Sequence, residues 1–469
     1  MIPTDAADLQ PPLIRDRAFW ALNLTQFLGA FNDNLFKQLV MLLCVDRALS
    51  GGRDAQGLAM ILFAWPFIAF SGFAGYLSDR YSKRTIIVLC KAAEFVIVLL
   101  GLIGFTTGNL SVLLGVLCLM GVHSAFFGPS KYGILPELLR SSDLPRANGT
   151  MLMATFLAII FGLSAAGAAK QAFHEDLWMA SVPCLIVAVL GLVTSLFIRS
   201  TPVAQPDLKF NWSSIAIAPD TRRLLMKDRT LLGVLLMSSV FWFVGGTVYP
   251  PAINAFGKDQ LRLDDLTTGA MAASTGLGIA IGCVLAGILS KNRVRSWLVR
   301  AGAWGLTLSL AALCLPGPGF DAVREEIRQT KQLRLQKAAD PESAAFTAAT
   351  TSRDLSQPRP NPFRRGSLLG PYGSVVALIS VGLFAGFFSV PLQVYLQTAA
   401  PSDQKGRIIG AWNLLNWIGI AGSGIVYSIG RAVLVDGLEL PHATLFGFAA
   451  VLMLPVALFY RPPETDVGA

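Results

Sequence analysis

The sequence predicts an all-α polytopic membrane protein with twelve transmembrane helices arranged as two related six-helix halves. Hydrophobic residues make up 53% of the 469-residue chain and charged residues only 14%, whereas soluble domains carry about 25% charged residues. The apolar residues form long runs separated by short charged loops, and each run can cross a bilayer core of about 30 Å. Segments of the first half also recur in the second, which indicates an internal duplication.

Twelve apolar runs, bounded by charged or helix-breaking residues, are predicted to be the membrane helices. They cover residues 18–45, 57–78, 84–106, 109–139, 144–172, 177–198, 229–256, 266–290, 296–315, 368–398, 405–430 and 442–460. We expect no removable signal peptide, because the chain starts with a polar tail and not with a basic region, a short apolar region and a cleavage site.

The distribution of basic residues over the loops predicts that both termini are cytoplasmic. With the N-terminus inside, the tails and even-numbered loops hold twenty Lys and Arg residues, and the short opposite loops hold six. The positive-inside rule favours this orientation. Residues 316–367 would then lie outside with nine more basic residues. Long loops translocate largely regardless of their charge, so the predicted orientation stands.

Two pairs of segments define the duplication. The segment 75–84 matches 287–295 at an offset of 212, and 121–149 matches 382–410 at an offset of 261. The offsets differ by 49 residues, which indicates an insertion in the loop 316–367. We therefore expect an N-terminal half over 1–198, a cytoplasmic linker over 199–228, a C-terminal half over 229–460 and a tail over 461–469.

The inserted loop has two parts of different composition. Asp321 to Ala339 is rich in charged helix formers and is predicted to be a helix, whereas the remainder is rich in Pro, Ser and Thr and is predicted to be disordered. A solvated tether is the simpler interpretation. Binding of a partner or of lipid headgroups is the alternative.

The loop after the second predicted helix carries a recognisable motif. Its sequence, Gly75-Tyr76-Leu77-Ser78-Asp79-Arg80-Tyr81-Ser82-Lys83-Arg84, resembles the loop motif of major facilitator transporters, with serine at the usual second glycine. Two parallel six-helix halves are also the plan of that superfamily. The resemblance implies a gating role for Asp79, Arg80 and Arg84, whose charges can pair in one conformation and separate in another. A positive-inside anchor would explain the basic residues but not Asp79.

Charged and amide side chains lie in the middle of the first predicted helix. Asp33, Asn34 and Lys37 follow Gln26 and Asn32 within one dense cluster. Asp33 and Lys37 are four residues apart and share a helix face, so a self-neutralised structural pair is one interpretation. A cavity-facing site is the other, in which Asp33 binds a cation, exchanges a proton or meets a cationic substrate group.

The third and fourth predicted helices carry further charges. Lys91 and Glu94 are equally compatible with a structural and a functional role. In the fourth helix we expect Gly128 and Pro129 to bend or unwind the backbone one turn before Lys131, which creates a candidate anion site; snorkelling of Lys131 to the interface is the alternative. His123 is either a core histidine or a proton relay.

The second half offers aromatic residues in place of charges. Predicted helices seven, eight, ten and eleven contain no internal Asp, Glu or Lys but carry Phe387, Phe388 and Trp412 among their aromatic residues. With Tyr132 and Tyr249, these are our predicted apolar contacts for an amphipathic substrate, although packing and interface anchoring are the usual roles of such residues. Glu137 is expected to be a conformational latch with Arg140 or Arg146, and Arg407, which aligns with Arg146, is included among the gating residues.

Several motifs together resemble the bacterial lysophospholipid transporters, the LplT family, and especially the transporter domain of relatives fused to an acyltransferase. They are Gln26 to Asn34, Gly128 to Leu138, Arg146 to Gly149, Val390 to Leu392 and Gly406 to Gly410. The resemblance implies a multi-pass inner-membrane protein that moves lysophosphatidylethanolamine and related lipids from the outer to the inner leaflet for reacylation. Lys131 would take the phosphate and Asp33 the ammonium group or a coupling cation.

The resemblance has one clear departure and several further implications. Some family members have an arginine at the position that we align with Tyr249. We expect no cofactor or metal site, with Na⁺ or H⁺ as the coupling ion through Asp33 or His123. A separate acyltransferase would be the functional partner, the protein is expected to be a monomer, and the net charge of +9 is assigned to topology, so no nucleic acid is expected.

Three other functions compete with lysolipid transport as interpretations of the sequence. A proton-coupled exporter of drugs or other amphiphiles would share the fold and the loop motif. A membrane acyltransferase is rejected, because the H-x₄-D motif is absent: Gly128, Met179 and Gly447 stand five positions after the three histidines. A scaffold or sensor that kept the fold without transport stays open.

Overall fold

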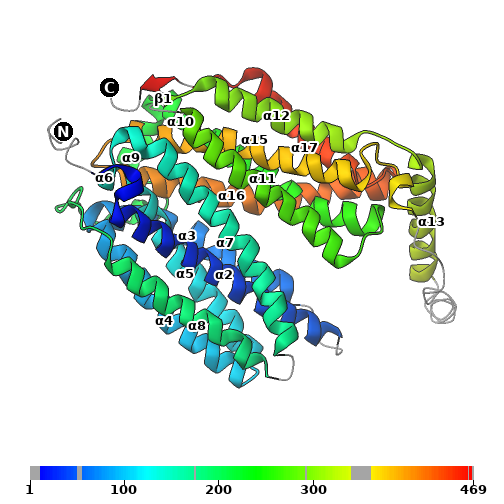
Figure 1. The fold of residues 1–469 in the computed structure, drawn as a ribbon, viewed down its shortest axis with the longest axis horizontal. Helices are drawn as coiled ribbons and strands as arrows, with labels where there is room; N and C mark the ends of the chain where they lie inside the picture. Colours follow the sequence, from blue (N-terminus) through cyan, green and yellow to red (C-terminus); the bar gives the residue numbers. More distant parts are fainter. Residues whose placement is uncertain are drawn as a thin grey trace.

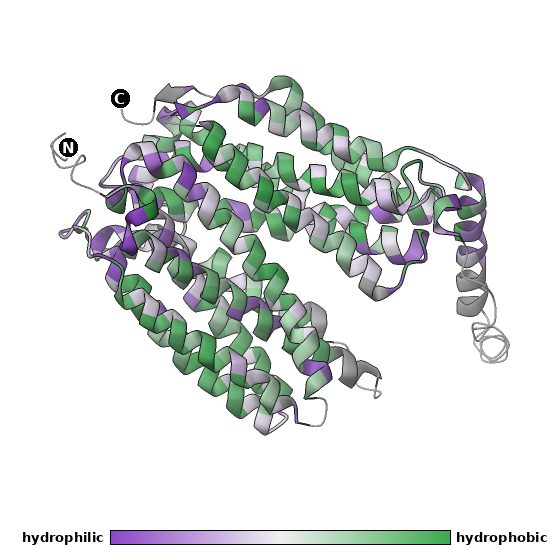
Figure 2. Cartoon of the chain, in the orientation of Figure 1, coloured by the Kyte–Doolittle hydropathy of each residue, from purple (hydrophilic) through white to green (hydrophobic). Residues whose placement is uncertain are grey.

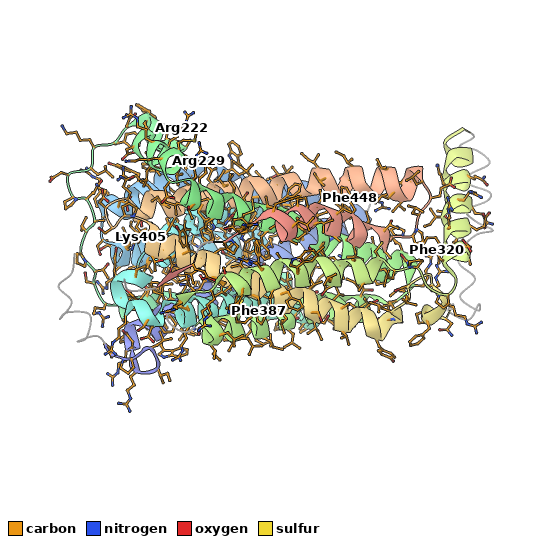
Figure 3. All side chains as sticks on the ribbon, turned by 90° about the horizontal axis from the view of Figure 1, so that it is seen from above. Arg222, Arg229, Phe320, Phe387, Lys405 and Phe448 are labelled. Carbon is orange, nitrogen blue, oxygen red and sulfur yellow. The ribbon has the colours of Figure 1, made fainter. Side chains whose placement is uncertain are left out.

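The computed structural model describes residues 11–49, 55–173, 176–290, 293–339, 361–462 and 464–466. Its long helices run side by side in two groups, blue to green and green to red in Figure 1, which converge at the end where both termini lie. We call this the linker end. Arg222 and Lys405 lie there, whereas Phe320 lies at the opposite end and Phe387 between them (Figure 3).

The first group contains six long helices and one short one. They are α2 (Arg17–Leu49), α3 (Gln56–Arg80), α4 (Lys83–Thr106), α5 (Leu110–Gly133), α6 (Leu135–Leu138), α7 (Leu144–Ala172) and α8 (Leu177–Leu196). Local chemistry sets some of the boundaries. The side chain of Asn109 accepts hydrogen bonds from the amides of Ser111 and Val112 at the start of α5, which satisfies two of the helix's free N–H groups.

The second group also has six long helices. They are α10 (Arg229–Thr247), α11 (Asp265–Ser290), α12 (Ser296–Cys314), α15 (Gly370–Ala399), α16 (Lys405–Arg431) and α17 (Thr444–Phe459). In the order of the chain, α9 (Pro219–Lys227) comes between the two groups, and α13 (Phe320–Ala339) comes between α12 and α15. The strands β1 (Arg293–Val294) and β2 (Thr465–Asp466) pair antiparallel.

Short helical turns complete the described elements. The 3₁₀ turns are η1 (Leu13–Arg15), η2 (Ser141–Asp143), η3 (Trp212–Ile215) and η6 (Pro362–Arg364), and the π-helical segments are η4 (Val248–Ala252), η5 (Ala255–Gln260) and η7 (Ala432–Gly437). In Figure 2 hydrophobic residues dominate the long helices, and hydrophilic residues gather at the linker end and on α13.

A helix occupies all or most of each of the twelve predicted spans, and the all-α polytopic fold is confirmed. In the described part of the chain, ten helical segments are long and apolar enough to cross a membrane, and Thr444–Phe459 is a shorter apolar helix. The helix predicted over Asp321–Ala339 is α13 and is also confirmed. Most of the remaining insertion, for which disorder was predicted, covers residues 340–360 and lies outside the described residues.

Two predicted helices differ from the structure near prolines. The seventh, predicted over 229–256, stops at Thr247, and Tyr249 adopts φ −110° and ψ 122°. Pro250 causes this, because a proline disfavours helical geometry in the residue before it. In the fourth, the backbone stays helical through Gly128 and Pro129, so the predicted unwinding there was wrong. The interruption falls at Ile134, between α5 and α6.

The two groups meet mainly where α3 crosses α16 and where α7 crosses α11. Glycines permit the close approach at both crossings. A Cβ atom on Gly75 would lie 2.7 Å from the carbonyl oxygen of Gly406, and one on Gly287 would lie 3.2 Å from the Cα atom of Arg146. Larger residues would push the helices apart, so these glycines set the spacing that brings the site residues of both groups together.

Candidate functional site

A buried polar cluster occupies the interior of the first group, between α2, α4 and α5. Asp33 on α2 accepts a 2.6 Å hydrogen bond from the hydroxyl of Ser124 on α5. The Nε2 atom of His123 lies 3.9 Å from one Asp33 oxygen and 3.5 Å from a carboxylate oxygen of Glu94. His123 therefore bridges two carboxylates on different helices, which places it to hold or transfer a proton between them.

Glu94 is the most heavily bonded carboxylate of this cluster. It is 1% exposed and lies 2.6 Å from the ammonium group of Lys91, which is 2% exposed. Its second oxygen accepts a 2.7 Å hydrogen bond from the side-chain amide of Asn32. The ammonium of Lys91 also lies 5.0 Å from the ring centre of Phe127. Lys91 and Glu94 thus neutralise each other inside the bundle, as a buried ion pair must.

Lys131, unlike Lys91, has neutral hydrogen-bond and ring partners. Its ammonium donates a 2.7 Å hydrogen bond to the side-chain oxygen of Gln26 and lies 5.4 and 4.9 Å from the ring centres of Phe127 and Tyr132. Gln26 in turn donates a 2.6 Å bond to the hydroxyl of Thr155 on α7. The positive charge of Lys131 therefore contacts an amide and two rings, and its ammonium can still pair with a bound anion.

Lys37 and Asn34 form a separate contact farther along α2. The ammonium of Lys37 donates a 3.0 Å hydrogen bond to the side-chain oxygen of Asn34 and lies 4.9 Å from the ring centre of Phe63. Within the described part of the chain Lys37 makes no ion pair with Asp33, so the structure does not form the self-neutralised Asp33–Lys37 pair. Asp33 instead points to the His123 side of the cluster.

An apolar cavity of about 210 Å³ lies mainly among the helices of the second group and reaches α7 of the first. Its walls come from α7 and from all six long helices of the second group, and they include Phe156, Phe241, Trp242 and Tyr249. The rings of Phe156 and Trp242 stack with centres 6.5 Å apart. Phe156 directly follows Thr155 in α7. The same turn of this helix therefore contacts the Lys131–Gln26–Thr155 hydrogen-bond chain through Thr155 and the cavity through Phe156.

The predicted aromatic contacts occupy different positions around this cavity. Tyr249 lines it directly. Phe388 is fully buried and stacks on Phe241, a wall residue, at 5.7 Å, so it supports the wall from behind. Phe387 packs edge-on against Phe384. Trp412 donates a 2.7 Å hydrogen bond to Ser238 and its ring meets that of Tyr132 at 5.5 Å, which places it between the two groups near Lys131.

The predicted gating residue Asp79 closes the linker end across the two groups. Its fully buried carboxylate accepts hydrogen bonds from the backbone amides of Gly406 at 2.6 Å and Arg407 at 3.0 Å, and from the guanidinium of Arg407 at 3.0 Å. Arg407 also contacts Asp220 and Gln205 of the segment between the groups. A carboxylate at the end of α3 thus caps the start of α16.

The other predicted gating residues do not cross between the groups in this way. Arg80 donates to the carbonyl of Leu208, and Arg84 donates to the carbonyl of Ile198 at 2.7 Å. The expected partner of Glu137 was wrong: Glu137 pairs with Lys83 at 2.6 Å, not with Arg140 or Arg146. Both partners of this pair belong to the first group.

The side chain of the predicted gating residue Arg146 is exposed. The contact between the two groups at this position comes from a nearby residue. Two residues farther on, Asn148 forms a reciprocal amide pair with Gln397 on α15, with hydrogen bonds of 2.7 and 3.0 Å. Sequence reasoning assigned no role to this pair or to the link between Gln26 and Thr155. The available signal was an amide or hydroxyl within a long apolar run, which is costly in a membrane unless it has a partner.

Comparison with known proteins agrees with this architecture. The family model of the Major Facilitator Superfamily matches residues 22–323. The chain belongs to the major facilitator superfamily. By its family it is a multi-pass membrane transporter. The predicted fold is confirmed.

Individual relatives refine this assignment. The chain is 26% identical to the lysophospholipid transporter LplT of Klebsiella pneumoniae subsp. pneumoniae, with 96% of each chain covered. It is 28% identical to LplT of Enterobacter sp. (strain 638), over 65% of this chain and 75% of the relative. These similarities confirm the predicted resemblance of the sequence to the lysophospholipid transporters.

Solved structures of the same fold are more distant in sequence. The outward-facing bacterial homologue of the iron transporter ferroportin has a TM-score of 0.62 at 14% identity, covering 94% of this chain and 98% of that one. The human organic anion transporter MFSD10 has a TM-score of 0.65 at 15% identity, covering 95% and 100%. At this identity the likeness concerns the fold alone.

Proposed function

We propose that this transporter moves lysophospholipids across the membrane toward the cytoplasmic leaflet by alternating access. The observation that carries the proposal is the junction on α7, where Thr155 holds the Gln26–Lys131 chain and Phe156 lines the apolar cavity. A lysophospholipid has an anionic phosphate and one acyl chain. The junction offers a cation to the first and aromatic walls to the second.

The charge balance around Lys131 favours an anionic group. The buried polar cluster and the neighbouring Lys37 farther along α2 together contain three lysines, Lys37, Lys91 and Lys131, against the two carboxylates Asp33 and Glu94, so one positive charge is in excess when His123 is neutral. Lys91 is matched by Glu94 at 2.6 Å, whereas Lys131 has neutral contacts. A phosphate at Lys131 would complete the balance, and Asp33 would face an ethanolamine ammonium or a coupling Na⁺ or H⁺.

The acyl chain would supply much of the affinity. Each methylene removed from water contributes about 0.8 kcal/mol, and the cavity wall offers rings from Phe156, Phe241 and Trp242. Tyr249 stands in that wall where some family members are expected to have an arginine. This position is therefore apolar except for one hydroxyl, so the headgroup would depend more heavily on Lys131 here.

The decisive experiment is uptake of lysophosphatidylethanolamine into proteoliposomes by the Lys131→Ala variant. Hydrogen bonds to a charged group contribute about 1.5–3 kcal/mol, so uptake efficiency should fall about 10- to 100-fold. Lys209→Ala, which removes an exposed lysine of the linker, should transport like the wild type. Retention of full uptake by correctly folded Lys131→Ala protein would overturn the assignment. Sodium and proton gradients applied separately identify the coupling ion.

A second candidate is a proton-coupled exporter of drugs or other amphiphiles. The arrangement of His123 between Asp33 and Glu94 favours it, because protonation of His123 would change its attraction to both carboxylates. Dye efflux and lysolipid uptake measured with the same proteoliposomes separate the two candidates. Efflux of a cationic dye that lysolipid does not inhibit would support the exporter.

A further inference from the structure

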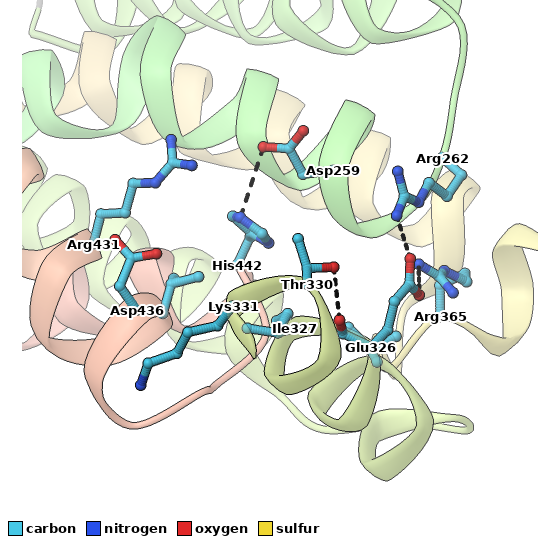
Figure 4. Close-up of a pocket in the computed structure, with 12 residues that line it drawn as sticks. Asp259, Arg262, Glu326, Ile327, Thr330, Lys331, Arg365, Arg431, Asp436 and His442 are labelled. Carbon is cyan, nitrogen blue, oxygen red and sulfur yellow. Dashed lines mark hydrogen bonds and ion pairs between the residues drawn. The ribbon is translucent and has the colours of Figure 1, made fainter. Parts of the chain in front are cut away.

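A second pocket, of about 460 Å³, lies at the end of the molecule opposite the linker end. α13 of the insertion forms one wall, and η5, η7 and the segment before α17 form the others (Figure 4). Its volume is within the usual range of small-molecule sites, about 300–1,000 Å³. The charge count predicts that this end faces away from the cytoplasm.

Ion pairs hold α13 against the second group and build the pocket. Glu326 on α13 pairs with Arg262 and lies 2.7 Å from Arg365. On the other side of the helix, Glu439 pairs with Arg328 at 2.9 Å and Lys331 at 3.4 Å. Arg328 also pairs with Glu325 at 3.3 Å, so four cations share three carboxylates, and these contacts hold α13 against the second group.

Two charged groups in the pocket wall are not used by these ion pairs. Among the described residues, Arg431 at the end of α16 and Asp436 in η7 make no ion pair with each other or with another residue. His442, which lines the same pocket, is 7% exposed, and its Nδ1 atom has no hydrogen-bond partner in the described part of the chain. Its Nε2 atom faces Asp259 at 3.7 Å.

We infer that this pocket binds a zwitterionic phosphate–amine group of the phosphoethanolamine type. The guanidinium of Arg431 would take the phosphate, because its planar donors match phosphate oxygens. The carboxylates of Asp436 and Asp259 would take the ammonium. The Nδ1 atom of His442 would gain a partner in the same ligand. A ligand with one charge of each sign can pair with both Arg431 and Asp436, whereas a simple anion can pair only with Arg431.

The position of the pocket connects it to the apolar cavity. Ile420 lines that cavity and Arg431 lines the charged pocket, both on α16. They are eleven residues apart, which is about 16 Å along a helix. The segment η4–η5 makes the same connection, since Tyr249 belongs to the cavity and Asp259 to the pocket. The choice of ligand rests on the proposed function, in which the pocket is a loading site for the headgroup.

The test is binding of soluble sn-glycero-3-phosphoethanolamine to the purified full-length protein, measured by isothermal titration calorimetry. Arg431→Gln should raise the dissociation constant about tenfold, as expected for loss of one charge-assisted contact. Asp436→Asn should weaken binding too. The matched control is Arg324→Gln on the exposed face of α13, which should bind within about twofold of the wild type.

Further arms separate this site from the proposed transport site. Lys131→Ala should keep headgroup binding, and Arg431→Gln should weaken lysophosphatidylethanolamine and the soluble headgroup alike. Inorganic phosphate should compete poorly. The inference is overturned if no saturable binding occurs, if Arg431→Gln and Arg324→Gln bind alike, if phosphate competes as well as the zwitterion, or if binding depends on Lys131. Binding that depends on Arg431 in a protein without lysolipid uptake would support the pocket and refute the proposed function.

Discussion

Replacing Asp79 with asparagine is expected to open the linker end of the transporter. In the structure the carboxylate accepts three hydrogen bonds, two from backbone amides of Gly406 and Arg407 and one from the Arg407 guanidinium. The side chain of Asp79 is 0% exposed and that of Arg407 is 5% exposed. An asparagine would retain one acceptor oxygen, lose the negative charge and turn an N–H donor toward the remaining donors.

The size of the effect follows from these contacts. Removing one partner of a buried ion pair costs about 3–5 kcal/mol. The lower value applies here, because Arg407 keeps its contacts with Asp220 and Gln205. About 3 kcal/mol corresponds to a shift of roughly two orders of magnitude in the equilibrium between closed and open linker ends. A closed state populated 99:1 would become about equally populated with the open one.

Spin labels on the two groups at the linker end measure this shift. Cysteines introduced at the exposed positions Ser141 and Ser402 report the separation by pulsed electron spin resonance. Cys118 and Cys314, which are not fully buried, are first replaced by serine. Asp79→Asn should add or strongly enrich a longer distance.

Asp220→Asn provides the matched control for this experiment. Asp220 contacts the same arginine, but its side chain is 50% exposed, and exposed ion pairs contribute about 0–1 kcal/mol. Its distance distribution should stay close to that of the wild type. An unchanged distribution in Asp79→Asn, or an equal shift in both variants, would refute the reasoning that burial makes Asp79 the closing contact.

Three further outcomes are expected. Trp242→Ala, in the cavity wall, should weaken uptake of long-chain lysolipids more than of short-chain ones, and equal losses in a chain-length series would contradict the acyl-chain role of the cavity. Glu94→Gln leaves Lys91 charged and buried, so it should destabilise the protein by about 3–5 kcal/mol and lower Tm in detergent; an unchanged Tm would contradict this. Burial raises the pKa of Glu326, but hydrogen bonds from Arg262 and Arg365 outweigh it and lower the pKa overall. The stabilisation from Glu326 is therefore present above the usual glutamate pKa of about 4.3 and lost as the pH falls through the lowered value, so hydrogen exchange in α13 should rise only in strong acid, and a rise near neutral pH would count against these pairs.

The sequence predicted the helices well because a membrane span is a local property. A run of apolar residues of sufficient length identifies it without knowledge of its neighbours. The local rule failed where a proline altered the backbone: Pro250 ends regular helix before Tyr249, whereas Pro129 lies within continuous helix. A proline's effect depends on whether neighbouring groups satisfy the freed backbone carbonyl, which a single sequence does not show.

The partners of the polar residues were harder to predict than the residues themselves. Asp79 and Arg407 were both identified, but they are far apart in the chain, and their pairing required the packing of α3 on α16. The prediction for Glu137 chose arginines nearby in sequence, whereas the structure brings Lys83 of the preceding hairpin to it. Nearness in sequence is a poor guide when helices turn back on one another.

Among the described residues, the buried salt bridge between the two groups lies at the crossing of α3 and α16. By the offsets of the repeat, Asp79 corresponds to Lys291 and Arg407 to Arg146, so the sequence has two basic residues at the equivalent positions, and these two cannot form a salt bridge with each other. The structure instead joins α7 to α11 and α15 through close glycine contacts and the neutral amide pair of Asn148 and Gln397. Closing the linker end therefore depends on electrostatics at α3–α16 and on side-chain size at α7–α11. The same division separates the buried charges of the first group from the apolar cavity against the second, and an amphipathic substrate requires both kinds of surface.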